Sequence, residues 1–253
     1  MVESAGAAPD SAVGVRAFAA NSISTTLIGN IRRLYSDALN EVKAGFGVRH
    51  GINGYTRFGV SAYILAVAAV EAYLNERFLS QAARLSLPAS PLWDINANTV
   101  ERMKIREKVL LVPKLLLGET FDTGRPPFQD FDLLVNVRND LVHFKFPYQL
   151  PAYVRSLEAR KVVLAAVPNS YGADYPWPAK LECTEGIRWA HNTACAMMVG
   201  LMDFAARQQS AGAQSLLGFL RPDLHRPSLQ PIELTSVRRW FRDNGIDPDS
   251  NSP

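Results

Sequence analysis

The residues from Val60 to Val70 limit the folds open to this chain more than any other stretch. Apart from Ser61 the run is apolar or aromatic throughout, so a helix built from it is apolar on nearly every side. Such a helix belongs in the middle of a bundle, where neighbouring helices cover it from several directions. Glu71 ends the run well short of the roughly 20 apolar residues that span a bilayer. We therefore expect an all-α bundle around a helix from about Phe58 to Leu85, and no membrane segment.

Composition agrees with a globular protein in a reducing compartment. With 253 residues, of which 47% are hydrophobic and 20% charged, the chain can bury a sizeable core and is not largely disordered. The net charge of +3 is too small to indicate a nucleic-acid-binding protein by itself. Glu3 stands where a secretory signal needs positive charge, and the chain has two cysteines, Cys183 and Cys195. We therefore expect a cytoplasmic location and no disulfide.

The spacing of apolar residues predicts five main helices. They run from about Ser22 or Ser24 to Gly45, from Phe58 to Leu85, from Asn98 or Thr99 through Leu110, from Phe131 to Phe146 and from Thr184 to Gln208. Pro113 is expected to kink or end the third helix. The prolines around Arg221 and His225 argue against a helix there, and a short capped helix is expected from Thr235 to Asn244.

The chain divides by composition into three parts. Residues 1–19 are rich in Ala, Gly, Ser and Pro and are expected to form a flexible tail. Residues 20–210 are expected to form the helical domain, with an irregular insertion at 148–180 before the last main helix. Inside that insertion, Val162 to Val167 fits either a strand or a short helix. Residues 211–253 are expected to form a C-terminal extension that carries the short helix.

The helix expected from Phe131 to Phe146 has two contrasting faces. An apolar stripe that should face the core is formed by Leu134, Val137, Leu141 and Phe144. The opposite face gathers polar side chains, namely Asn136, Asn139, Asp140 and His143, with Arg138 at the edge of the stripe. Groups that donate protons and hold phosphate are thus expected together on one exposed surface.

The sequence VRNDLVHF, in which Arg138 and His143 form Arg-x-x-x-x-His and Asn139 follows the arginine directly, resembles the motif of the HEPN superfamily (higher eukaryotes and prokaryotes nucleotide-binding domains). The sequence AVAAVEAYLNERF from Ala66 also resembles the helix that precedes this motif in many such proteins. The resemblance extends to helix order across residues 20–210. It implies an all-α bundle of about four or five main helices, paired in a homodimer whose two motif helices face each other across a cleft.

Active members of the HEPN superfamily are metal-independent endoribonucleases, so the resemblance implies that activity here, without cofactor or metal. The products would be a 2′,3′-cyclic phosphate and a 5′-hydroxyl, from single-stranded RNA. Histidine titrates near neutrality, so His143 would be the general acid or base. Arg138 would hold the phosphate, Asn139 would orient it, and Glu71 would brace the site. The implied setting is a toxin–antitoxin, stress or phage-defence system with a neutralising or regulatory protein partner.

Several alternatives stay open. Other HEPN-like domains are catalytically inactive modules for dimerisation or for nucleic-acid or nucleotide binding. Glu71 lies on an expected buried face and meets either Arg138 or a backbone group or structural arginine. His143 is either catalytic or a surface histidine bonded to Asn139.

The remaining basic residues of interest lie outside the motif. Lys145 stands where HEPN partners of nucleotidyltransferases often have Tyr, and it either approaches the RNA backbone or is solvated. Arg238 and Arg239 either contact RNA beside Trp240 or belong to a tail helix packed on its own domain. On the other helices, Arg32 and Arg33 are expected to be solvated. Arg188 and His191 are expected to form a pair on a helix surface.

Overall fold

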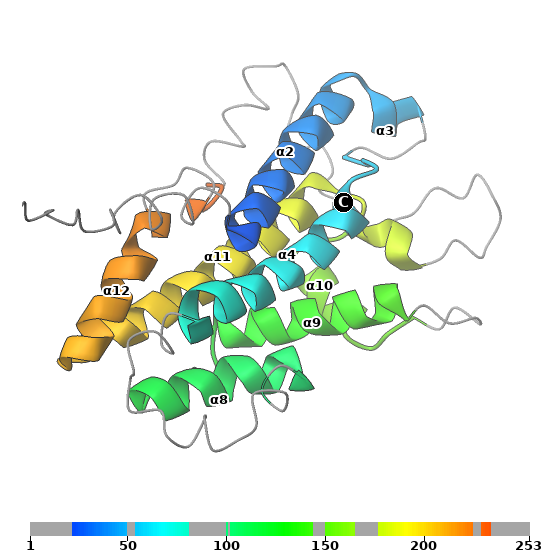
Figure 1. The fold of residues 1–253 in the computed structure, drawn as a ribbon. Helices are drawn as coiled ribbons and strands as arrows, with labels where there is room; N and C mark the ends of the chain where they lie inside the picture. The colour runs from blue at the N-terminus through cyan, green and yellow to red at the C-terminus, as the bar shows by residue number, and fades with distance from the viewer. Residues whose placement is uncertain are drawn as a thin grey trace, which may run out of the picture.

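The computed structural model describes residues 22–49, 54–80, 100, 102–143, 150–164, 177–224 and 229–233. In Figure 1 these residues form α2 (Ile23–Lys43), α3 (Phe46–Arg49), α4 (Gly59–Tyr73), the π-helix η1 (Leu74–Leu79), α8 (Ile105–Leu117), α9 (Phe128–Val142), α10 (Val154–Ala159), the 3-10 helix η2 (Trp177–Leu181), α11 (Thr184–Arg207) and α12 (Ala211–Leu224). The extended pairing among them is one isolated bridge between Tyr55 and Cys183. The all-α class is therefore confirmed for the described part of the chain.

Helix α4 lies at the centre of the bundle, as its apolar sequence predicts. It packs against α2, α9 and α11, and Figure 1 shows it between α2 and α9. Its fully buried side chains include Ala66, Val67 and Val70, which belong to one wide buried face of the helix, while Ser61 on the other side is exposed. The central position follows because water-exposed apolar surface on any face of this helix would be unfavourable.

The helix continues past Tyr73 as the π-helix η1, which carries Glu76. The Glu76 carboxylate contacts the first residues of α2, where its Oε2 accepts from the Ser22 hydroxyl at 3.3 Å and from the Ser24 backbone N–H at 3.5 Å. A carboxylate is favourable there because the first backbone N–H groups of a helix have no intrahelical acceptor. Residues 81–85, the end of the predicted helix, lie outside the described residues.

Helix α8 passes through Pro113 instead of ending there. It begins at Ile105 and continues to Leu117, and it ends at Gly118, which adopts φ 71°. Pro113, Val112 and Leu116 are all buried, so apolar packing offsets the hydrogen bond that proline cannot donate. Glycine ends the helix because it adopts the left-handed conformation without steric cost. The predicted start at Asn98 or Thr99 lies outside the described residues.

Helix α9 begins at Phe128 and ends at Val142, so the predicted range from Phe131 to Phe146 is wrong at its end. His143 is the C-cap residue, with φ −107° and ψ 33°. Residues 144–149, with Pro147, lie outside the described residues. In the insertion, residues 162–164 form neither a strand nor a helix, while α10 and η2 were not predicted.

Helix α11 confirms the last main helix of the prediction, and its two cysteines are buried and free. Helix α12 contradicts the expectation that prolines exclude a helix near Arg221. It packs against α11 and buries Leu216, Leu217 and Leu220, whose spacing of three and four residues makes an apolar stripe. The free energy gained by burying these leucines outweighs the cost of Pro222 in the last turn of the helix. The expected tail at 1–19 and helix at Thr235–Asn244 lie outside the described residues.

Candidate functional site

The expected site lies at the C-terminal end of α9, and the buried side chains on the other face of this helix hold it against the core. Leu134 and Val137 are fully buried, so the predicted apolar stripe is confirmed at both positions. Asn139 and His143 are exposed and Arg138 is half-buried. The buried leucine and valine therefore fix the backbone from which the polar site residues project.

His143 sits just beyond the helix. Its backbone N–H donates to the Asn139 carbonyl at 2.9 Å, which closes the last helical turn. The C-cap conformation takes the imidazole off the helical path, so a five-residue helical spacing does not describe its position relative to Arg138. The side chain is exposed, and within the described part of the chain it forms no hydrogen bond or ion pair.

Arg138 lies on the side of α9 that faces the bundle. Seven residues are close to two helical turns, so Arg138 shares its face with the fully buried Phe131. The guanidinium is half-buried, and it has no hydrogen bond or ion pair with any residue that the structure describes. Arginine carries five N–H donors and keeps its charge, so this side chain is available to an anion such as a phosphate.

Asp140, which lies between Arg138 and His143 in the sequence, already accepts a hydrogen bond. Tyr153, immediately before α10, donates its hydroxyl to Asp140 Oδ2 at 2.7 Å and packs edge-on against Trp177 at 6.1 Å between ring centroids. Burial, with the Asp140 carboxylate as a further cause, raises the pKa of the Tyr153 hydroxyl above its ordinary value. The phenol therefore stays a proton donor and ties α10 to the end of α9. No sequence pattern links Tyr153 to Asp140.

Glu71 belongs to a different contact from the one predicted. Its carboxylate lies 3.8 Å from Lys108 Nζ, and Lys108 also donates to Asn75 Oδ1 at 3.2 Å. The Lys108 side chain is 1% exposed, whereas Glu71 is 38% exposed. Among the described residues no ion pair joins Glu71 to Arg138. Glu71 thus stabilises the docking of α8 on α4 instead of bracing the arginine.

Two basic residues predicted to be on the surface contact each other, one of them from the interior. His191 is fully buried, and Arg32 donates its Nε–H to His191 Nε2 at 3.3 Å, although these residues are 159 positions apart. The expected surface pair of Arg188 and His191 is therefore wrong, whereas Arg32, expected to be solvated, is half-buried. Lys145, Arg238 and Arg239 lie outside the described residues.

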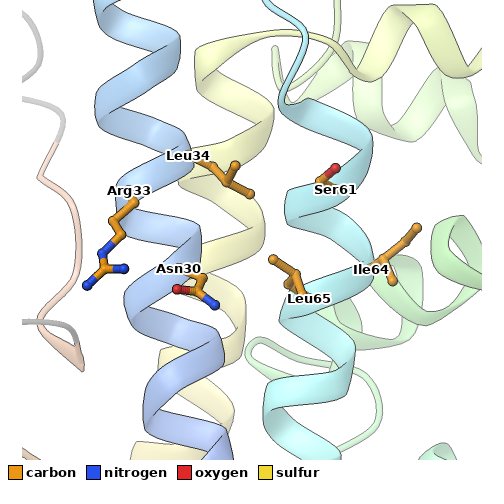
Figure 2. Close-up of a pocket in the computed structure, with 6 residues that line it drawn as sticks. All are labelled: Asn30, Arg33, Leu34, Ser61, Ile64 and Leu65. Atoms are coloured by element: carbon orange, nitrogen blue, oxygen red, sulfur yellow. The ribbon is translucent and has the colours of Figure 1, made fainter.

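A groove runs between α2 and α4, with a volume of about 530 Å³. Figure 2 shows Leu34 and Leu65 directed into the space between the two helices, while Arg33 points away from it. Asn30, Ser61 and Ile64 complete the lining. Neither Arg138 nor His143 lines this groove, so it is separate from the site on α9.

None of the helices described is both long and apolar enough to cross a bilayer. Within the same residues, no group of three or more His, Cys, Asp and Glu side chains is arranged to hold a metal ion. Comparison of the chain with protein-family models, with curated proteins and with solved structures gave no match.

Proposed function

We propose that this protein is a metal-independent endoribonuclease that cleaves single-stranded RNA. The observation that supports it is that the last turns and the C-cap of α9 carry a half-buried guanidinium, Arg138, and an exposed imidazole, His143, neither of which has a partner among the described residues. A half-buried arginine is normally bonded to another group, so the unpartnered Arg138 guanidinium is suited to bind an anion. The exposed His143 imidazole is open to a ligand and can transfer protons near neutral pH.

In the proposed reaction the ribose 2′-oxygen attacks the adjacent phosphorus and the bond from phosphorus to the 5′-oxygen breaks. One imidazole, that of His143, removes the 2′-hydroxyl proton, and a second acid gives a proton to the departing 5′-oxygen. Arg138 holds the non-bridging phosphate oxygens and stabilises the charge that develops on them. Asn139, exposed beside Arg138, orients the phosphate. The products are a 2′,3′-cyclic phosphate and a 5′-hydroxyl.

A second copy of the chain supplies the second imidazole in this proposal. Each chain brings one Arg138 and one His143, whereas the reaction needs a separate base and acid. A two-fold axis near the end of α9 would bring two sets to one cleft. The homodimer, its RNA substrate and a neutralising or regulatory protein partner are parts of the same proposal.

A catalytically inactive module for dimerisation or for nucleic-acid or nucleotide binding is the second candidate. Asp140 favours it, because a carboxylate held by Tyr153 places negative charge next to the proposed phosphate site. Such a protein would bind RNA through Arg138 without cutting it.

The test incubates the purified protein with RNA of mixed sequence in excess chelator. We expect His143→Ala and Arg138→Ala to lose at least about 100-fold of the cleavage rate. The matched controls, Gln129→Ala on the exposed face of α9 and Arg33→Ala on α2, should cleave like the wild type. Analysis of the ends should show the cyclic phosphate and the 5′-hydroxyl.

Cleavage that requires added metal, or that survives His143→Ala, contradicts the proposed mechanism. RNA binding without cleavage by the wild type favours the inactive module. In that case Arg138→Ala, but not Arg33→Ala, should weaken binding.

A further inference from the structure

Figure 1 shows the segment Leu229–Glu233 to one side of α2, and hydrogen bonds to its backbone hold it to α2 and α11. Asn192 of α11 donates its Nδ2–H to the Ile232 carbonyl at 3.0 Å, and its Oδ1 accepts the Ile232 N–H at 2.8 Å. One side-chain amide thus pairs with both backbone groups of one residue, as a neighbouring strand would. Arg32 of α2 donates to the Gln230 carbonyl.

The strap, as we call Leu229–Glu233, also buries apolar surface. Leu229 is 5% exposed and Ile232, three residues later, is 8% exposed. His191 of α11 is fully buried. The strap contacts the same two side chains, Arg32 and Asn192, that contact its imidazole.

These contacts fix the protonation state of the imidazole. Arg32 has only donors, so His191 Nε2, at 3.3 Å from Arg32 Nε, must be the acceptor. The proton then sits on Nδ1, which donates to Asn192 Oδ1 at 3.0 Å. A continuous set of hydrogen bonds therefore runs from Arg32 through the neutral His191 to Asn192 and on to the Ile232 backbone.

The titratable groups beside this set include a thiol and a phenol, both of which stay neutral. Cys195 Sγ lies 3.7 Å from His191 Nε2, and burial raises the pKa of its thiol to about 12. Tyr35 of α2 interacts electrostatically with Glu185 and Arg188 of α11, and the strap itself carries Glu233. Burial raises the pKa of the Tyr35 hydroxyl, which keeps it neutral too.

We propose that Leu229–Glu233 is a strap that opens when His191 is protonated. A proton on Nε2 would turn the acceptor of Arg32 into a second donor and would set two positive charges side by side at about 3 Å. The guanidinium must then move away, and with it goes the bond to the Gln230 carbonyl. Burial and the neighbouring guanidinium both disfavour the imidazolium, so the opening requires acidic pH, below about 6.5, where a free imidazole takes up its proton.

Hydrogen exchange of the full-length protein, followed by mass spectrometry, tests the strap. Corrected for intrinsic exchange rates, protection of the strap should fall about tenfold between about pH 8 and about pH 5.5, while α11 keeps its protection. Arg32→Gln removes the second cation, so it should give lower protection that no longer depends on pH. His191→Gln, which cannot take a proton in this range, should also remove the dependence.

Arg33→Gln is the matched control, because Arg33 is an exposed neighbour on α2 and should leave the wild-type pH dependence intact. Asn192→Ala should reduce strap protection at both pH values. The proposal is overturned if strap protection is the same at both pH values, or if Arg32→Gln keeps the wild-type dependence. A loss of protection spread evenly over the whole molecule also overturns it. Arg32→Gln decides the question even if His191→Gln fails to fold, because Arg32 is only half-buried.

Discussion

Glu182 shows how one buried carboxylate can set the pH dependence of stability. Its Oε2 accepts the Gly59 backbone N–H at 2.6 Å, at the start of α4. Burial raises the pKa of this carboxyl to about 7, against the lowering effect of the backbone N–H groups of Gly59 and Val60. In the unfolded chain the pKa of a glutamate is about 4.3. The folded state therefore binds the proton more tightly, and stability is lost as the pH rises from about 4.3 to about 7.

Glu182→Gln should remove this loss, because the amide oxygen still accepts from Gly59 but cannot ionise. We expect the variant to be about 1–3 kcal/mol more stable than the wild type at about pH 8, and equally stable at about pH 4. Urea unfolding at both pH values measures the difference. A variant less stable than the wild type at the higher pH would mean that the charged carboxylate stabilises the start of α4 by more than its burial costs.

Glu71 provides a second prediction at the scale of a residue. The buried ammonium of Lys108 has the Glu71 carboxylate 3.8 Å away, so Glu71→Gln removes a counter-charge from a cation that is shielded from water. We expect the free energy of unfolding to fall by about 1–3 kcal/mol. The control is Glu107→Gln, an exposed change on α8 that should be neutral within about 0.5 kcal/mol. Because Glu71 does not contact Arg138, RNA cleavage should be unchanged, and a selective loss of cleavage would restore the predicted brace.

At the scale of elements, α4 and η2 approach so closely that a glycine is required. A Cβ added to Gly59 would lie 2.0 Å from the Leu181 carbonyl oxygen, which is backbone and cannot move without shifting η2. We expect Gly59→Ala to destabilise the protein by about 2–4 kcal/mol. Gly29→Ala is the control, because nothing lies within 4 Å of its added Cβ in α2, and it should stabilise by about 0.5–1 kcal/mol. Thermal unfolding of both variants measures the contrast, and equal effects would contradict it.

The helices that the sequence predicts well are those with an uninterrupted apolar pattern. Helices α2, α4 and α11 match their predictions because burial of one stripe, or in α4 of a wide apolar face, decides their structure. Helix α12 was missed because the prolines near Arg221 were given more weight than the three buried leucines. The end of α9 was placed too late because a capping residue such as His143 leaves no mark in the apolar pattern.

The side-chain contacts were less predictable than the helices. The bond from Arg32 to His191 joins positions 159 residues apart, and Lys108 meets Glu71 from another helix. Such partners depend on how the helices pack, which local spacing does not specify. Local spacing did identify Arg138, Asn139 and His143 as half-buried or exposed polar groups on a helix with a buried face.

At the scale of the whole molecule, the proposed reaction makes a quantitative prediction about mixed dimers. If one imidazole is the base and the second, from the other copy, is the acid, a dimer that carries one His143→Ala chain is inactive. In an equal mixture of exchanged wild-type and His143→Ala chains, about one quarter of the dimers have two imidazoles. The mixture should therefore show about one quarter of the activity of the same total amount of wild-type protein.

The measurement is the initial rate of RNA cleavage after the subunits have exchanged, with the dimer checked by small-angle scattering. Independent sites, each complete in one chain, would instead leave about one half of the activity. Mixing wild type with Arg33→Ala controls for exchange and should keep full activity, because Arg33 lies outside the proposed site. A rate of one half, or full activity from a monomer, would mean that a single chain holds both the acid and the base. A second proton-transfer group would then have to be sought near the end of α9, where the Tyr153 hydroxyl donates to Asp140.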